Sequence, residues 1–255
     1  MFQKFVHWNQ VACQKFDNLF VPKSWRIDGL LDFTHNVVPD LIRKNSRVCD
    51  VGAGKRPFIG TEIPKQSQYI IGIDIDKHEL EQAPPNIYDK TMVADIGSSD
   101  TKTKGINATV VICEAVLEHV KNNAQAIKNI SELTANQGTI ALFIPSRYAL
   151  FAIINRWLPE SIKRKLLFSI FPGTEHAQGF PAYYNQCTPD KITRLLESNN
   201  VTVQKVIPYY QCTYFSFFLP AHVAWRFYQL ISYGLLRSQA SESFTIIGTK
   251  NYNEN

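Results

Sequence analysis

Short apolar runs and stretches with helical spacing alternate along most of the chain. Residues 124–133 place apolar side chains at helical spacing, and Thr188-Pro189-Asp190 is a helix start signal for a helix that runs to about Ser198. Strands that alternate with helices predict an α/β fold built on a mostly parallel sheet. The seven runs that we expect to form its strands are 47–51, 69–74, 91–94, 108–113, 139–144, 201–207 and 244–248.

Three segments fall outside this alternation. Residues 1–45 mix aromatic and basic side chains at helical spacing, which indicates either helices packed on the edge of the sheet or a lid over a ligand. Residues 146–187 show apolar helical spacing with a basic polar side, and within the insertion 209–243 residues 215–236 are nearly apolar all round. We therefore expect an N-terminal helical lid (1–45), a core (46–145), a helical cap insertion (146–187) and a C-terminal part of the core (188–255) that carries the apolar insertion 209–243.

The composition suits one large α/β domain with insertions. The chain has 255 residues, 45% of them hydrophobic, and a net charge of +5, which is too small to indicate a nucleic-acid partner. Its five cysteines are scattered, and Cys49 and Cys113 fall in predicted strands, which favours reduced thiols over disulfides or a zinc site. The N-terminus lacks the apolar segment of a signal peptide. We expect a cytoplasmic protein that can associate with a membrane, and its oligomeric state stays open.

A glycine-rich turn follows the first predicted strand. Gly52 and Gly54 allow the backbone to turn sharply and to approach a ligand closely after Asp50, and Pro57 stands where a helix can begin. Backbone N–H groups beside the positive end of a helix favour an anionic or zwitterionic ligand. Dinucleotide sites have a third glycine at the position of Pro57, so a nicotinamide oxidoreductase is disfavoured.

Acidic residues also follow the next two predicted strands. Asp74 lies 20 positions after Gly54, where a carboxylate can accept hydrogen bonds from both hydroxyls of a ribose, and Asp95 follows the third strand. Together with Gly72-Ile73-Asp74 and Leu117-Glu118-His119-Val120, these residues resemble the motifs of the class I S-adenosylmethionine (SAM)-dependent methyltransferases that act on small molecules.

The resemblance implies a fold and a cofactor. The fold is a Rossmann-like seven-stranded sheet of order 3-2-1-4-5-7-6, with an antiparallel last strand and helical insertions that form a cap over the substrate site. The activity is methyl transfer from SAM, with Asp95 and Ile96 contacting the adenine. The residues expected at the cofactor are Asp50, Gly52, Ala53, Gly54, Asp74, Ile75, Asp95, Ile96 and Cys113.

The segment after the fourth strand carries the candidate catalytic residues, Glu118 and His119. His119 is either a general base for a substrate hydroxyl, because histidine titrates near neutrality, or a structural residue. Similar quinone O-methyltransferases bind a cation there, but their first glutamate falls at Ala115, so we expect no metal. The candidate acceptor contacts are His176, Tyr183 and Tyr184.

The function that we expect is O-methylation of a small or lipid-like hydrophobic acceptor. An N- or C-methyltransferase of another small metabolite and a SAM-binding protein without activity remain alternatives. The basic residues Lys163, Arg164 and Lys165 and the apolar insertion 209–243 suggest contact with a membrane surface.

Overall fold

The computed structural model describes residues 2–55, 57–61, 63–66, 68–102, 105–158 and 180–252. Seven strands form one sheet of order β3-β2-β1-β4-β5-β7-β6. The strands are parallel except β7, which is antiparallel to β5 and β6, so the order and the direction expected from the resemblance are confirmed. The strands are β1 (Arg47–Val51), β2 (Tyr69–Asp74), β3 (Lys90–Val93), β4 (Ala108–Glu114), β5 (Thr134–Pro145), β6 (Val201–Tyr209) and β7 (Ser243–Lys250).

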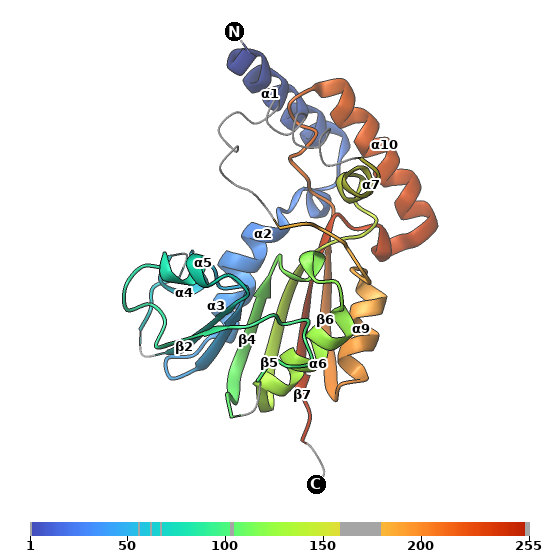
Figure 1. The fold of residues 1–255 in the computed structure, drawn as a ribbon. Coiled ribbons are helices and arrows are strands. Elements are labelled where there is room, and N and C mark those ends of the chain that lie inside the picture. The colour runs from blue at the N-terminus through green and yellow to red at the C-terminus, as the bar shows by residue number, and fades with distance from the viewer. Residues whose placement is uncertain are drawn as a thin grey trace.

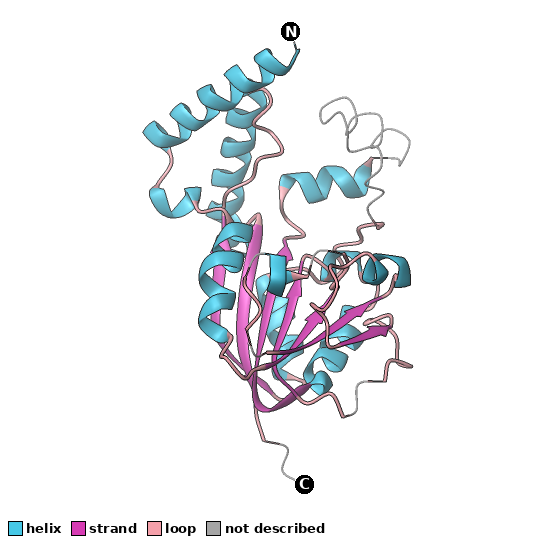
Figure 2. Ribbon diagram, turned by 90° about the vertical axis from the view of Figure 1, so that its left-hand side faces the viewer, coloured by secondary structure: helices cyan, strands magenta, loops and turns pink. Residues whose placement is uncertain are grey.

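Helices cover both faces of the sheet (Figure 2). Alternate residues of a strand point to opposite faces, so Val48 joins one hydrophobic cluster and Cys49 the other. The cluster that contains Cys49 includes the apolar sides of α6 (Asn123–Leu133) and α9 (Pro189–Glu197). The opposite cluster includes residues of η2 (Phe33–Val37) and α3 (Val38–Leu41), which follow α2 (Gly29–Asp32).

A second group of helices lies beyond the carboxyl ends of the parallel strands (Figure 1). Helix α1 (Phe2–Phe20) packs along α10 (Leu219–Leu236), and α7 (Leu150–Trp157) contacts α10. We call this group the helical cap, defined as residues 2–27, 147–158 and 210–240. The segment 1–45 is therefore divided, because its first part belongs to the cap and residues 29–41 pack on the sheet. Edge packing is the wrong description of either part.

The helix expected after the glycine turn is not regular. The short helix α4 (Phe58–Thr61) contains non-helical backbone at Ile59, with φ −83° and ψ 127°, and at Gly60, with φ 102°. The side chain of Ile87 occupies the space that a Cβ at Gly60 would need. The argument from a helix dipole beside the turn is therefore wrong for this chain, and ligand contacts at the turn depend on its own backbone and side chains.

The cysteines behave as the sequence indicates. All five are free thiols, and Cys49 and Cys113 are buried in strands of the sheet. Within the described residues, no helix is both long enough and apolar enough to cross a membrane. The predicted basic residues 163–165 and His176 lie outside the described part of the chain.

Candidate active site

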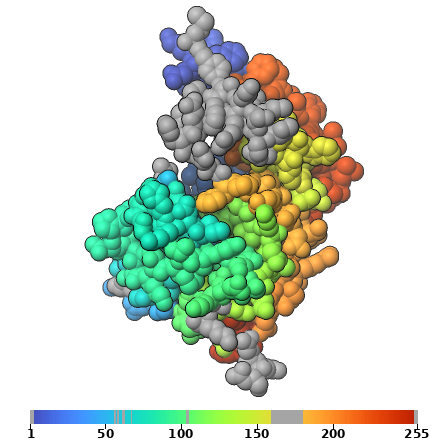
Figure 3. Space-filling model, in the orientation of Figure 1, coloured from blue at the N-terminus to red at the C-terminus, as the bar shows by residue number. Residues whose placement is uncertain are grey.

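A cavity of about 540 Å³ opens at the carboxyl ends of β1, β2 and β4. In the space-filling view, the orange segment that begins at residue 180 crosses above the teal and green parts of the chain (Figure 3). Five of the predicted cofactor residues line this cavity, namely Gly52, Asp74, Ile75, Asp95 and Ile96. We call it the first cavity.

The glycine turn needs its glycines for two separate reasons. Gly52 has a φ of +77°, and a Cβ there would lie 2.1 Å from Cγ2 of Val116, which also lines the first cavity. Gly54 has a φ of +50° and donates its N–H to Oδ2 of Asp74 over 2.9 Å. Positive φ values favour glycine, and the absent side chain at Gly52 leaves the room that Val116 fills.

Asp74 is held from two sides. Besides the bond from Gly54, its Oδ1 accepts from the backbone N–H of Asp76 over 2.9 Å. Each carboxylate oxygen can accept a second hydrogen bond, so a fixed acidic group with spare acceptor capacity lines the cavity. This arrangement suits the pair of hydroxyls of a ribose.

Asp95 lies at the other end of the cavity lining. Its Oδ1 accepts from the N–H of Gly97 over 2.8 Å, which fixes the turn after β3. Ile96 is buried, and its carbonyl accepts from Asn129 of α6 over 2.7 Å. Ile75 is more than half exposed on the cavity wall, where an apolar side chain suits the face of a base.

The other four predicted cofactor residues do not line the cavity. Asp50, Ala53 and Cys113 are buried, and Gly54 acts through its bond to Asp74. Burial raises the pKa of the Cys113 thiol well above its usual value, so this side chain is an inert part of the core. Cys113 does not line the first cavity, and its predicted role at the cofactor stays a prediction.

Three features in and around the glycine turn and the first cavity escaped the sequence analysis. The hydroxyl of Tyr88 donates to the carbonyl of Ala53 over 3.0 Å, and its ring occupies the space beside Gly72. Val116 fills the space left by Gly52, and Ala115 has a φ of +51° although it is not glycine. A backbone strained in this way is common at functional sites. The aromatic signal at Tyr88 was present in the sequence, but no local pattern connects it with the turn.

A second cavity of about 450 Å³ adjoins the first. The residues that line both cavities are Glu114, Ala115, His119 and Phe180. The walls of the second cavity combine acidic residues with aromatic and apolar ones, among them Phe143, Phe151, Phe180, Ala182, Tyr184 and Tyr214. The rings of Phe151 and Tyr214 stack with centroids 3.7 Å apart. The pair of cavities therefore provides two compartments that meet at His119.

His119 lies at this junction, and one of its ring nitrogens is hydrogen-bonded to the backbone. Its Nδ1 is 3.1 Å from the carbonyl oxygen of Pro181, and its Nε2 is 3.7 Å from Oε1 of Glu118. A carbonyl only accepts hydrogen bonds, so the neutral ring carries its proton on Nδ1 and has a lone pair on Nε2. The side chain is about one third exposed, which leaves it accessible from the cavities.

Glu118 is buried beside His119. Burial is the main reason why its pKa rises to about 8, and the charge of Glu114 adds to the effect. Its Oε2 has no hydrogen-bond partner within the described structure, while its backbone carbonyl accepts from the N–H groups of Tyr183 and Tyr184. Glu118 thus ties the segment 180–184 to the site, and its burial disfavours the charged form of its carboxyl group.

The predicted acceptor residues are separated. Tyr184 is buried and lines the second cavity, as expected for an acceptor site, but Tyr183 lines the first cavity. The ammonium group of Lys121 lies 5.4 Å from the centre of the Tyr183 ring. The two tyrosines diverge because Tyr184 has a φ of +52°, which turns the chain between them. His176 lies outside the described residues.

Comparison with known proteins defines the class to which this site belongs. Residues 23–206, well over half of the chain, match the family model of a methyltransferase domain, and the chain belongs to this family. A search of curated protein sequences finds no match. The family and the first cavity together indicate SAM as the cofactor, because the residues present provide the acidic and apolar groups that its ribose and adenine require.

Solved structures support the fold at low sequence identity. A SAM-dependent methyltransferase from Mesorhizobium loti is 12% identical and has a TM-score of 0.53, with 84% of this chain and 96% of that chain covered. A Listeria monocytogenes protein to which the same activity is attributed is 14% identical and has a TM-score of 0.56, with 88% and 99% covered. A Bacillus halodurans protein of attributed methyltransferase activity is 12% identical, with a TM-score of 0.54 and 86% and 99% covered.

Proposed function

We propose that this methyltransferase transfers a methyl group to a hydroxyl oxygen of a small or lipid-like apolar acceptor held in the second cavity. The observation that carries the proposal is the junction of the two cavities at His119. In this arrangement the first cavity holds the cofactor and the second holds the acceptor, so the two reactants meet beside a side chain that can accept a proton.

The first cavity would hold SAM through Asp74 at the ribose, through Ile75, Asp95 and Ile96 at the adenine, and along the turn at Gly52. When bound, SAM supplies a methyl group on a sulfonium centre, which is a good electrophile. The main tasks of the chain are therefore to orient the acceptor and to exclude water. Phe180 lines both cavities, so it is suited to shielding the junction.

The walls of the second cavity support an apolar acceptor. Phe143, Phe151 and Tyr214 offer flat surfaces on which an aromatic ring or an acyl chain can pack, and no lysine or arginine is among its described lining residues. Among these described residues, a phosphate or carboxylate group would find no lysine or arginine to compensate its desolvation. This favours a neutral acceptor over an anionic one.

His119 is suited to the role of general base. The lone pair on Nε2 can accept the proton of a hydroxyl, which makes the oxygen a better nucleophile. Glu118 lies 3.7 Å away with its pKa near 8. A positive charge on His119 favours the ionised form of Glu118, and an ionised Glu118 would stabilise the protonated histidine.

The test measures methyl transfer from labelled SAM to phenols, long-chain alcohols and amines. We expect a hydroxyl acceptor to be methylated, and His119→Gln to lower turnover by roughly 10²–10⁴-fold with SAM affinity nearly unchanged. The matched control is His78→Gln, which changes an exposed histidine on α5 (Lys77–Glu81) outside both cavities. A change below about threefold in His119→Gln would show that positioning alone drives the reaction.

One observation favours a second candidate, the methylation of an amine. Carboxyl groups of Asp28, Glu114, Glu118 and Glu242 line the second cavity, and burial raises the pKa of Glu242 to about 7. Carboxylates in an aromatic pocket can attract a cationic amine. The same assay separates the candidates, because an amine acceptor would be methylated in preference to an alcohol. If SAM binds and no acceptor is methylated, the chain is a SAM-binding protein.

A further inference from the structure

Helix α10 in the cap buries mainly polar side chains and exposes apolar ones, which is the reverse of an ordinary surface helix. Its buried side chains are mainly polar, namely His222, Trp225, Arg226, Gln229 and Ser232. Its outward side carries Phe227, Leu230, Ile231 and Leu235, which are exposed to 62%, 56%, 65% and 79%. A surface helix normally buries its apolar stripe and exposes its polar side. The outward side of α10 is therefore suited to contact something apolar.

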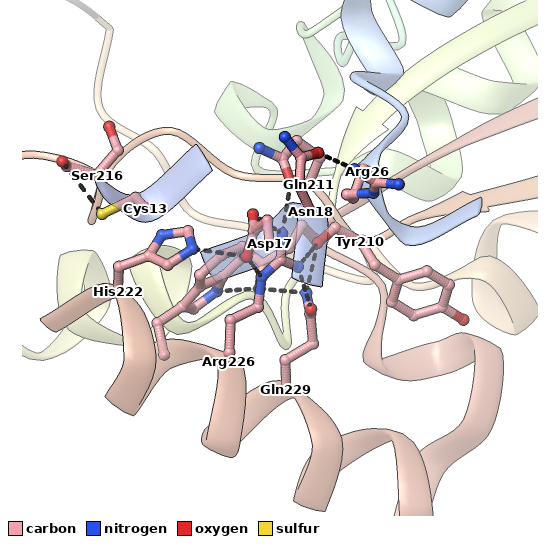
Figure 4. Close-up of polar contacts among 12 residues, drawn as sticks. Cys13, Asp17, Asn18, Arg26, Tyr210, Gln211, Ser216, His222, Arg226 and Gln229 are labelled. Atoms are coloured by element: carbon pink, nitrogen blue, oxygen red, sulfur yellow. Dashed lines mark hydrogen bonds and ion pairs between the residues drawn. The ribbon is translucent and has the colours of Figure 1, made fainter. Parts of the chain in front are cut away.

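A network of hydrogen bonds fixes α10 in this orientation. Figure 4 shows Asp17 of α1 between His222 and Arg226. Arg226 donates to both carboxylate oxygens of Asp17 over 3.0 and 2.6 Å, and Nε2 of His222 lies 2.8 Å from Asp17 Oδ1. Arg226 also donates to the carbonyl of Tyr210 and to Gln229, each over 2.8 Å.

This network makes rotation of α10 costly. Burial alone would raise the pKa of Asp17, but the hydrogen bonds from His222 and Arg226 outweigh it and lower the pKa. Asp17 is therefore ionised and paired at neutral pH. Turning the apolar side inward would break this pair and leave a buried charge without compensation.

The apolar side of α10 continues onto α1. Phe16, Phe20 and Val21 line a small hollow of about 80 Å³ together with Phe227 and Leu230. Leu19 and Phe20 are both largely exposed next to this hollow. We define the apolar face as the residues that α1 and α10 contribute together: Phe16, Leu19, Phe20, Phe227, Leu230, Ile231 and Leu235. A contiguous exposed surface of this kind indicates an interaction site.

The exposed charges on the described residues of the helical cap have one sign. Among residues 2–27, 147–158 and 210–240, the only acidic residue is Asp17, and it is buried in the network. The same segments contain eight lysines and arginines, of which Lys4, Lys15, Lys23 and Arg237 are exposed. Basic side chains without acidic neighbours beside an exposed apolar face are typical of helices that lie on anionic membranes.

We propose that the apolar face docks the protein on an anionic lipid bilayer. The aromatic and aliphatic side chains would enter the boundary of headgroups and acyl chains, and the exposed lysines would meet lipid phosphates. A second copy of the chain is a poorer partner, because two cationic surfaces without acidic residues repel each other. Helices α1 and α10 also lie outside residues 23–206, which match the methyltransferase family.

Docking through the cap places the bilayer on the side of the sheet where both cavities open. Helices α1, α7 and α10 lie beyond the carboxyl ends of the parallel strands, and Phe151 and Ala152 of α7 line the second cavity (Figure 1). A lipid-like acceptor could thus pass from the membrane to the second cavity along the cap. This consequence rests on the proposed function, whereas the docking itself does not.

The test is co-flotation of the full chain with vesicles. We expect flotation with vesicles of equal parts phosphatidylcholine and phosphatidylglycerol at low salt, weak flotation with phosphatidylcholine alone, and release at high salt. Lys15→Glu with Lys23→Glu should weaken binding by roughly 10–100-fold, since each charge acts close to the lipid surface. Phe227→Ser with Leu230→Ser should weaken it by at least about tenfold through lost apolar burial.

Matched controls separate docking from folding and from catalysis. Lys128→Glu with Lys191→Glu reverses two exposed charges on α6 and α9, outside the cap, and should leave flotation unchanged. All variants should unfold at the wild-type temperature and bind SAM with wild-type affinity. A variant that passes both checks and no longer floats has lost docking rather than its fold or its cofactor site. Wild type that stays with the soluble fraction, or cap variants that float as well as wild type, would refute the proposal. So would a stable dimer in gel filtration that Phe227→Ser with Leu230→Ser dissociates.

Discussion

Gly52→Ala is the substitution for which the structure defines the outcome most directly. The new Cβ would lie 2.1 Å from Cγ2 of Val116, far inside van der Waals contact, and the residue would keep a φ of +77°. The left-handed backbone costs a non-glycine residue about 1–2 kcal/mol. Overpacking against Val116 adds about 1–3 kcal/mol, unless the turn moves. We therefore expect a loss of about 2–5 kcal/mol of unfolding free energy and at least tenfold weaker SAM binding, because the turn lines the first cavity.

Two further variants separate the free-energy cost of the left-handed backbone from the cost of overpacking against Val116. Val116→Ala in the Gly52→Ala background removes the overlap and should restore the packing part of the loss, but not the backbone part. Gly105→Ala is the matched control for the backbone, because Gly105 has a φ of +85° and no described residue beyond its chain neighbours has an atom within 4 Å of the place of its Cβ. It should lose about 1–2 kcal/mol of unfolding free energy and no SAM affinity.

The assays are urea unfolding and titration calorimetry with SAM. If Gly52→Ala is as stable as wild type and binds SAM equally well, the turn does not need glycine at this position and the geometry of the first cavity is wrong. If Val116→Ala restores nothing in the double variant, contact with Val116 is not the cause of the loss.

Two other predictions concern carboxyl groups of the site. Asp74→Ala should weaken SAM binding by about 1–3 kcal/mol in calorimetry. The control Asp76→Ala changes an acidic residue outside the first cavity and should bind SAM as wild type does. If both variants bind SAM with equal affinity, Asp74 is not part of the cofactor site. Glu118 has a folded-state pKa of about 8 against 4.5 for a free carboxyl group, so its contribution to stability is complete below about pH 4.5 and is lost as the pH rises towards 8. Glu118→Gln should therefore be more stable than wild type by about 1–3 kcal/mol at pH 8, and it should show no such advantage at pH 4. Thermal unfolding of both proteins between pH 4 and pH 8 measures this. A stability difference that does not change with pH would contradict the prediction.

The sequence predicted the sheet because local patterns encode it. Apolar runs, strand-end acids and the helix start at Thr188 each depend on neighbouring residues, and β2 has the predicted bounds 69–74. Features that depend on distant contacts were missed. Tyr88 supports the turn from 35 positions away, and the helix expected after Pro57 fails at Gly60, where Ile87 occupies the space.

The cap illustrates the same limit. The sequence between 215 and 236 is nearly apolar all round, and hydrophobic periodicity cannot tell which side of such a helix faces inward when one buried ion pair decides it. Asp17 and Arg226 set the orientation, and nothing local to either residue identifies the other. The division of the predicted acceptor residues between two cavities has a comparable origin, in the backbone conformation of Tyr184.

The pairing of Asp17 with Arg226 has a consequence for synthesis on the ribosome. The two residues are 209 positions apart, so α1 leaves the ribosome long before its partner helix exists. At 5–20 residues per second, the delay is about 10–40 seconds. During that time Asp17 has no buried partner, and the aromatic side of α1 is open to any apolar surface nearby. β7, which completes the sheet between β5 and β6, follows α10 in the chain. The nascent chain therefore closes its cap only after α10 has emerged, and completes its sheet only after β7 has followed.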